Sequence, residues 1–218
     1  MQLKPEFRVR YVPHPAIEHL PQMERPAADH VRRLLRLQTS FYEHFAEAVA
    51  LFEYCRSEWS GYQPLPNAWA FIASRDAGMS IWHFGETLLA LRSGFKDCAT
   101  FRASVNFEAV REAWRSYGKC FPFAEQMRHA IAHAANLDKT VADREANALK
   151  SPVEVAGTGV TIDGRLGEGL IGDRFMTNIN GQLVEFAMSW DTTRSLLEIL
   201  HQTFSAFPPP ATPDPALE

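Results

Sequence analysis

The residues best suited to chemistry in this sequence are Arg128, His129 and His133. A histidine that titrates near neutrality can both accept and donate protons. An arginine guanidinium can hold phosphate oxygens through a planar fork of donors and offset developing negative charge. Together these side chains fit acid–base chemistry on a phosphodiester. Two other interpretations compete: a solvated helix face with coincidental histidines, and a metal site.

A metal site has little support from the surrounding sequence. His129 and His133 have the spacing of the two histidines in a His-Glu-x-x-His motif, but residue 130 is alanine, so the general-base glutamate is absent. Neither motif histidine has a glutamate three residues before it, as the Glu-x-x-His pattern of di-iron bundles would require, and no third ligand is indicated. We therefore predict no metal and no cofactor. The sequence also lacks a Gly-rich phosphate loop, a Ser-His-Asp set and a nucleotide-binding fingerprint.

The helix that carries these residues is predicted to run from Pro122 to about Leu137. With about 100° per residue, its side chains separate into two arcs. The apolar arc contains Phe123, Met127, Ala130, Ile131, Ala134 and Leu137. The polar arc contains Glu125, Arg128, His129, Ala132, His133 and Asn136. Arg128 and His133 diverge by about 140° on an ideal helix, so a distortion or a second protomer must bring them together.

Helical segments are predicted to precede this one. Apolar residues recur at three- and four-residue steps over residues 27–59 and 67–93, and Asn67 is a candidate N-cap for the second segment. Asn106 is a candidate N-cap for a shorter third helix. A further helix is expected over residues 138–149. Residues 1–25 contain four prolines and are predicted to form an extended arm.

The composition changes after residue 150, where glycine and β-branched residues become frequent. The dipeptide at 180–181 is Asn-Gly, which is typical of a type I′ hairpin turn. A two-residue loop there predicts three strand pairs: Ile179 with Gln182, Phe175 with Phe186, and Ile171 with Trp190. Asp191 is a candidate N-cap for a last helix.

These patterns predict a mainly α fold, an up-down helical bundle with an appended C-terminal β-hairpin and a final helix. The expected divisions are an N-terminal arm over residues 1–25 and a helical bundle over residues 26–150. Residues 151–207 are expected to form the hairpin and the final helix, packed on the bundle. Residues 208–218 are expected to be a disordered tail.

Charge and composition exclude several classes of protein. The 218 residues carry a net charge of -4, with 46% hydrophobic and 22% charged residues, which is a globular composition. That charge does not favour binding to a DNA duplex. No apolar run approaches the roughly 18 residues of a membrane span, and the N-terminus lacks the apolar core of a secretory signal. Cys55, Cys98 and Cys120 form no Cys-x-x-Cys pair and are predicted to be reduced thiols of a cytoplasmic protein.

The run from Arg128 to His133, followed by small residues and Asn136, resembles the Arg–polar–x3–His signature of the HEPN superfamily. That superfamily consists of helical-bundle proteins, many of which are metal-independent ribonucleases. The order of long helices before the motif is similar to its bundle, so the resemblance covers residues 27–149 in architecture and about ten residues in the motif. The segment over residues 151–190 is an addition to that bundle.

The resemblance implies a homodimer whose motif helices face each other and cleave RNA at their junction. In such a site the RNA 2′-OH is the nucleophile, His133 transfers a proton, Arg128 stabilises the charge on phosphorus, and His129 is the intervening polar residue. Some members of the superfamily keep the fold without activity, so the alternative is a catalytically inactive HEPN-like dimer that serves as a binding or regulatory module. A third possibility is an unrelated helical metal-binding protein. RNA is the expected ligand, and no membrane and no DNA duplex are expected as partners.

Overall fold

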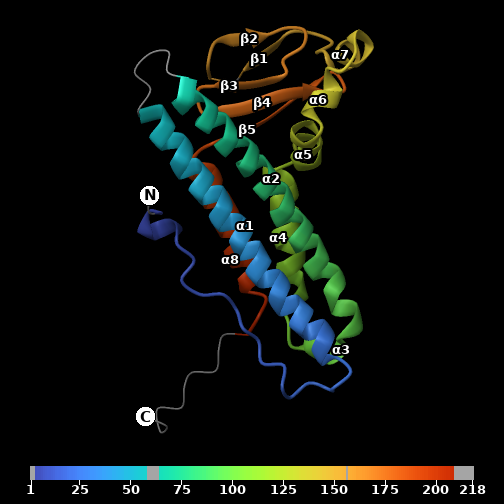
Figure 1. Ribbon diagram of the computed structural model, residues 1–218. Coiled ribbons are helices and arrows are strands. Elements are labelled where there is room, and N and C mark those ends of the chain that lie inside the picture. The colour runs from blue at the N-terminus through green and yellow to red at the C-terminus, as the bar shows by residue number, and fades with distance from the viewer. Residues whose placement is uncertain (1–2, 58–63, 156, 209–218) are drawn as a thin grey trace. The chain divides into compact units, whose positions relative to one another are not determined.

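The computed structural model describes residues 3–57, 64–155 and 157–208, and the chain in this part is mainly helical, as predicted (Figure 1). The helical elements are η1 (Pro5–Phe7), α1 (Arg25–Ser57), α2 (Pro64–Gly94), η2 (Phe95–Asp97), α3 (Ala99–Ala103), α4 (Phe107–Cys120), α5 (Ala124–Ala132), α6 (Ala134–Leu137), α7 (Val141–Asn147) and α8 (Trp190–Phe204). The strands are β1 (Val153–Val155), β2 (Val160–Ile162), β3 (Glu168–Ile171), β4 (Arg174–Ile179) and β5 (Gln182–Ala187). The end of the predicted first helix, residues 58 and 59, and residues 209–218 of the predicted tail lie outside the described residues.

The long helices follow the predicted apolar periodicity, with one difference at the start of α2. That helix begins at Pro64, so the prediction of Asn67 as its N-cap is wrong. Proline is tolerated in the first helical turn, where its missing N–H would have no partner in any case. At α4 the predicted cap is confirmed, because Asn106 Oδ1 accepts a hydrogen bond from the Ala109 N–H at 3.4 Å.

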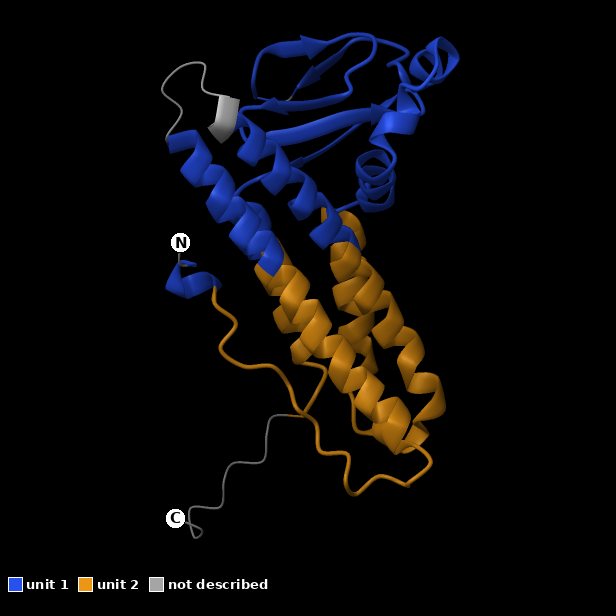
Figure 2. Cartoon of the chain, viewed as in Figure 1, with its two compact units in different colours: residues 1–7, 44–82, 121–194 blue, residues 8–43, 83–120, 195–218 orange. Residues whose placement is uncertain are grey.

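The chain divides into two compact units (Figure 2). Unit 1 contains residues 1–7, 44–82 and 121–194, and unit 2 contains residues 8–43, 83–120 and 195–218. In unit 2, Phe95 lies at the centre of an aromatic cluster with Phe101, Phe107 and Phe207. Unit 1 holds the motif residues and all five strands, so its packing decides the geometry of the candidate site.

The strand region of unit 1 is larger than the single hairpin predicted. Strands β1 and β2 form one antiparallel pair, and β3, β4 and β5 form a three-stranded antiparallel sheet. A small apolar core lies within this region; its buried members are Leu149, Val155, Ile162 and Met176. On the helical side, α5 contacts β4 and β5, and α7 contacts β4. The sheet is therefore a packing partner of the helix that carries the motif.

The hairpin at Asn180 and Gly181 has the predicted register near its turn. Both residues have positive φ angles, 52° and 75°, and the pairs Ile179–Gln182 and Phe175–Phe186 are confirmed. The pairing of Ile171 with Trp190 is wrong, because Ile171 pairs with Arg174 across a second turn and β5 ends at Ala187.

The chain leaves the sheet after β5 because Ser189 acts as the N-cap of α8. The Ser189 hydroxyl oxygen accepts a hydrogen bond from the Thr192 N–H at 3.2 Å, and the Ser189 carbonyl accepts one from the Thr193 N–H at 3.0 Å. Trp190 is consequently the first residue of α8. The prediction of Asp191 as the N-cap is therefore wrong by two residues, since a serine hydroxyl fills that role.

Two polar side chains connect the sheet to the segment that follows α6. Asn147 is buried, and its Nδ2 donates to the carbonyl oxygens of Leu137 at 3.2 Å and Asp143 at 2.8 Å. Its Oδ1 accepts from the Asn180 N–H at 3.0 Å, which ties the hairpin turn to α7. Arg165, with a side chain 5% exposed, donates through Nε to Asp138 at 2.9 Å.

Candidate functional site

The motif helix ends earlier than predicted. A single helix to Leu137 was expected, but α5 ends at Ala132, and His133, with φ −121° and ψ 23°, separates it from the short helix α6. The His133 N–H still donates to the His129 carbonyl at 3.0 Å. Beyond the break, Leu137 is buried and its carbonyl accepts from Asn147. These contacts compensate for the lost continuity of the helix and account for the difference from the prediction.

The two histidines lie side by side at the surface, as residues four apart on a helix do. His129, Ala132 and His133 are all exposed. The imidazole rings of His129 and His133 have centroids 4.8 Å apart and planes inclined by 46°. Two groups that can accept or donate protons therefore lie within reach of one small anionic ligand.

Arg128 differs from its predicted place on an open polar arc, since its side chain is only 26% exposed. Its Nη2 donates to Glu125 Oε1 at 2.5 Å, and its guanidinium carbon lies 5.0 Å from the centre of the Trp82 ring. Its Nε is buried and has no hydrogen-bond partner among the described residues. The structure thus places Arg128 against α2 and Glu125, and it pairs the two histidines with each other.

The apolar arc of α5 packs inward as predicted, and a glycine on α2 makes the close approach possible. A Cβ at Gly78 would lie 2.5 Å from Ile131 Cδ1 and 3.4 Å from Met127 Cγ. Met127 and Ala130 are buried, whereas Phe123 is 40% exposed and does not join the apolar arc. Phe123 precedes the first residue of α5, so helical periodicity does not apply to it.

A small cavity of about 180 Å³ lies behind the motif. Its lining is drawn from α2, from the α5–α6 region and from the three-stranded sheet with the loop before it: Arg75, Ala130, Ala134, Leu137, Asp138, Arg165, Gly167, Glu168 and Thr177. Ala130 and Ala134 directly follow the two motif histidines in sequence. No sequence pattern indicates this cavity, because its lining residues are spread over about a hundred positions of the chain.

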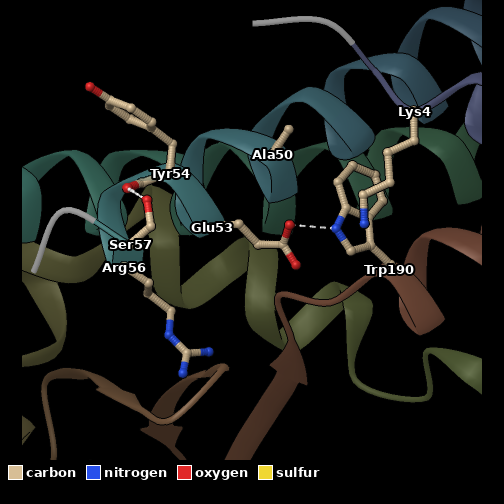
Figure 3. Close-up of a pocket in the computed structure, with 7 residues that line it drawn as sticks. All are labelled: Lys4, Ala50, Glu53, Tyr54, Arg56, Ser57 and Trp190. Carbon is tan, nitrogen blue, oxygen red and sulfur yellow. Dashed lines mark hydrogen bonds between the residues drawn. The ribbon is translucent and has the colours of Figure 1, made fainter.

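A second, more open hollow of about 630 Å³ involves none of the motif residues (Figure 3). Figure 3 shows Glu53 accepting a hydrogen bond from Trp190 Nε1, at 2.5 Å, with Lys4 beside the indole. The Lys4 ammonium lies 4.4 Å from the centre of that ring. Tyr54 and Arg56 extend away from Glu53 on opposite sides (Figure 3). At the centre of this hollow, the Glu53 carboxylate already accepts the Trp190 indole N–H, and Lys4 lies over the same indole ring.

The cysteines are free thiols, with Cys55 and Cys98 buried and Cys120 exposed. Burial raises the pKa of the Cys55 and Cys98 thiols. The exposed Cys120 is partly desolvated, which raises its pKa as well, and the nearby Glu198 carboxylate raises it further. A raised pKa lowers the thiolate fraction at neutral pH, so none of them has the environment of an activated nucleophile.

Within residues 3–57, 64–155 and 157–208, no group of three or more His, Cys, Asp or Glu side chains is placed to hold a metal ion. No helix in this part of the chain combines the length and the apolar character needed to cross a membrane.

Comparison with known proteins gives no match to this chain, whether with protein-family models, with curated proteins or with solved structures.

Proposed function

We propose that this chain is a HEPN-like, metal-independent endoribonuclease that acts as a homodimer through its motif helix. The observation that carries the proposal is the pair of exposed imidazoles, His129 and His133, with ring centroids 4.8 Å apart and Arg128 next to His129 in sequence. Arg128 itself lies against Glu125 and Trp82, so the proposal requires its guanidinium to turn toward the imidazoles when RNA binds.

In the proposed reaction the RNA 2′-OH attacks the adjacent phosphorus and the bond to the 5′-oxygen breaks. His133 accepts the 2′-OH proton and, as the imidazolium, passes it to the departing 5′-oxygen, which leaves a 2′,3′-cyclic phosphate and a 5′-hydroxyl end. Arg128 stabilises the negative charge that develops on the phosphoryl oxygens, and His129 lies beside the same phosphate.

Arg128 must leave Glu125 to meet a phosphate, and the energetics allow it. Glu125 is 62% exposed, and ion pairs at the surface contribute only about 0–1 kcal/mol. A phosphate diester offers the guanidinium two oxygens in bidentate geometry, which makes it a strong competitor for an exposed carboxylate.

A homodimer would complete the site. Ala132 is exposed and small, and it lies in the same surface as the two imidazoles, so a partner helix can approach closely there. A twofold axis near Ala132 makes an isologous contact and creates two equivalent sites, each with cationic donors from both protomers.

A subunit-mixing experiment tests both parts of the proposal. Arg128→Ala and His133→Ala are each expected to abolish cleavage of single-stranded RNA as pure homodimers. If one site takes Arg128 from one protomer and His133 from its partner, a mixed dimer keeps one intact site. Equimolar mixing after dissociation then restores about a quarter of the wild-type rate, since half of the dimers are mixed and each has one of two sites.

Matched controls are available on exposed helix faces away from the motif. Arg144→Ala on α7 and His201→Ala on α8 remove the same side-chain types from exposed positions and should leave the rate unchanged. Cleavage should also survive a chelator. Undiminished cleavage in either motif variant, or loss of activity with removal of a stoichiometric metal, contradicts the mechanism. A wild-type chain that is monomeric at micromolar concentration contradicts the dimer.

A catalytically inactive HEPN-like dimer that binds RNA or regulates a partner is the second candidate. The ion pair of Arg128 with Glu125 and its contact with Trp82 favour this alternative, because both engage the guanidinium before any ligand arrives. Its signature is RNA binding by the wild type with no cleavage over long incubation, and with binding retained in His133→Ala.

A further inference from the structure

Arg128 is held by two residues that belong to different helices. Its Nη2 donates to Glu125 Oε1 at 2.5 Å, three residues earlier on α5, and its guanidinium carbon lies 5.0 Å from the centre of the Trp82 ring on α2. The side chain is 26% exposed in this held position, whereas the neighbouring His129 and His133 are exposed. The motif cation is therefore sheltered, while the two imidazoles lie open to solvent.

The held position of Arg128 is only weakly favoured. Its Nε is buried and has no hydrogen-bond partner among the described residues, so one N–H of a charged group is desolvated without compensation. Glu125 is 62% exposed, and an ion pair at the surface changes an equilibrium constant by no more than about fivefold. The cation–π contact with Trp82 adds a contribution of similar size. A second anion of ordinary strength is therefore able to move the guanidinium.

The Glu125 carboxylate and an RNA phosphate compete for the same donors. Each anion offers oxygens that a guanidinium binds through two parallel N–H groups, and Glu125 already takes Nη2. One guanidinium cannot satisfy both anions in full, so the ion pair lowers the fraction of molecules that are ready to bind RNA. The apparent dissociation constant for RNA rises by the inverse of that fraction.

We propose that Glu125 is an internal competitor of RNA, which keeps Arg128 in the held position until a phosphate displaces it. The displaced guanidinium then turns toward the two imidazoles. This inference rests on the proposed function, because it describes how the same site is regulated. Its consequence is unusual for a residue beside a binding site, since removing the charge of Glu125 should improve RNA binding.

The first test measures binding without cleavage. The probe is a short, fluorescein-labelled, single-stranded oligonucleotide with 2′-O-methyl ribose at every position, which has no 2′-OH nucleophile and stays intact. Fluorescence anisotropy at physiological ionic strength gives its dissociation constant with the full chain. Glu125→Gln should bind the probe about two- to fivefold more tightly than the wild type, because about fivefold is the limit for a surface ion pair. Equal or weaker binding overturns the proposal.

Two comparisons separate the contact with Arg128 from a general effect of charge. Glu145→Gln on α7 removes the same charge from an exposed position of the same compact unit and should leave the affinity nearly unchanged. In an Arg128→Ala background, Glu125→Gln should have no effect, because the partner of the carboxylate is gone. If the gain persists without Arg128, or appears equally in Glu145→Gln, the cause is general repulsion of RNA and the proposal fails.

A spectroscopic measurement follows the guanidinium itself. Nuclei above the face of an indole are shifted upfield by its ring current, and the Arg128 guanidinium lies over the Trp82 ring. The Arg128 side-chain resonances, assigned by their loss in Arg128→Ala, should move downfield when the probe is added to the wild type. Resonances that stay in place when the protein is saturated with the probe show that Arg128 is not displaced, and the proposal fails.

Cleavage of unmodified RNA separates this inference from the proposed function. Glu125 acts on the protein before RNA binds, so Glu125→Gln should lower KM by the factor seen with the probe and leave kcat unchanged. Tighter, Arg128-dependent binding without any cleavage supports the inference and contradicts only the nuclease proposal. Cleavage that requires Arg128, with the same KM in the wild type and in Glu125→Gln, keeps the nuclease and overturns the inference.

Discussion

Gly85 on α2 is a position where the structure predicts the opposite of what helix propensity predicts. Replacing an interior helical glycine by alanine usually stabilises a helix by about 1 kcal/mol. At Gly85 a Cβ would lie 2.3 Å from Cζ and 2.4 Å from the hydroxyl oxygen of Tyr117. The Tyr117 ring is 6% exposed and stacks with Phe84 and Trp114, at 6.2 and 5.8 Å between centroids. The ring is thus held from two sides and cannot rotate away freely.

The magnitude follows from these opposing terms. Overpacking of a buried site costs about 1–3 kcal/mol, and a contact this short against a rigid ring places the cost near the upper end. After the gain in propensity, Gly85→Ala should lower the free energy of unfolding by about 2 kcal/mol. For a chain of this length that corresponds to a decrease in Tm of roughly 4–8 °C.

Thermal unfolding followed by circular dichroism measures this effect, with Gly118→Ala as the matched control. Gly118 lies on α4, and a Cβ there has no atom within 4 Å, so the same change should leave Tm equal or a few degrees higher. In a Tyr117→Leu background, Gly85→Ala should lose most of its cost. If Gly85→Ala is as stable as Gly118→Ala, the close packing of α2 on Tyr117 is refuted.

Two further predictions concern the motif arginine and a thiol. Arg128→Ala should abolish cleavage and lower Tm by only about 2–4 °C. The decrease is small because a partly exposed ion pair and one cation–π contact together contribute about 1 kcal/mol. A decrease in Tm of more than about 10 °C would show that Arg128 is a structural residue. Because burial and Glu198 raise the pKa of Cys120, its alkylation by iodoacetamide should rise with pH later than that of a free cysteine, and Glu198→Gln should move the profile to lower pH. A profile that coincides with free cysteine contradicts this environment.

Much of the fold was predictable because long apolar periodicities and local turn chemistry determine it. The helix α1 needs only an apolar stripe, α2 carries apolar residues over most of its circumference, and the register near Asn180 follows from the two-residue turn. The errors lie where a short polar side chain competes with continued regular structure. Ser189 starts α8 and so removes Trp190 from the strand, and no periodicity reveals such a competition.

The candidate site was predictable in part. Residue types and spacing selected His129 and His133, and the structure brings their rings together. The break at His133 and the contact of Arg128 with Trp82 depend on residues distant in sequence, so a helical wheel could not predict them. The cavity lined by Arg75 and Glu168 lay beyond sequence reasoning for the same reason, since these two residues are 93 apart in the chain.

Hydrogen bonds between the sheet and the segment after α6 determine when that segment can reach its final structure during folding. Asp138 receives its hydrogen bonds from Arg165, and the turn at Asn180 joins Asn147. During synthesis from the N-terminus, the helices up to α7 leave the ribosome before either partner exists. The segment after α6 therefore gains these contacts only after Arg165 and Asn180, 18 and 33 residues beyond the end of α7, have been added.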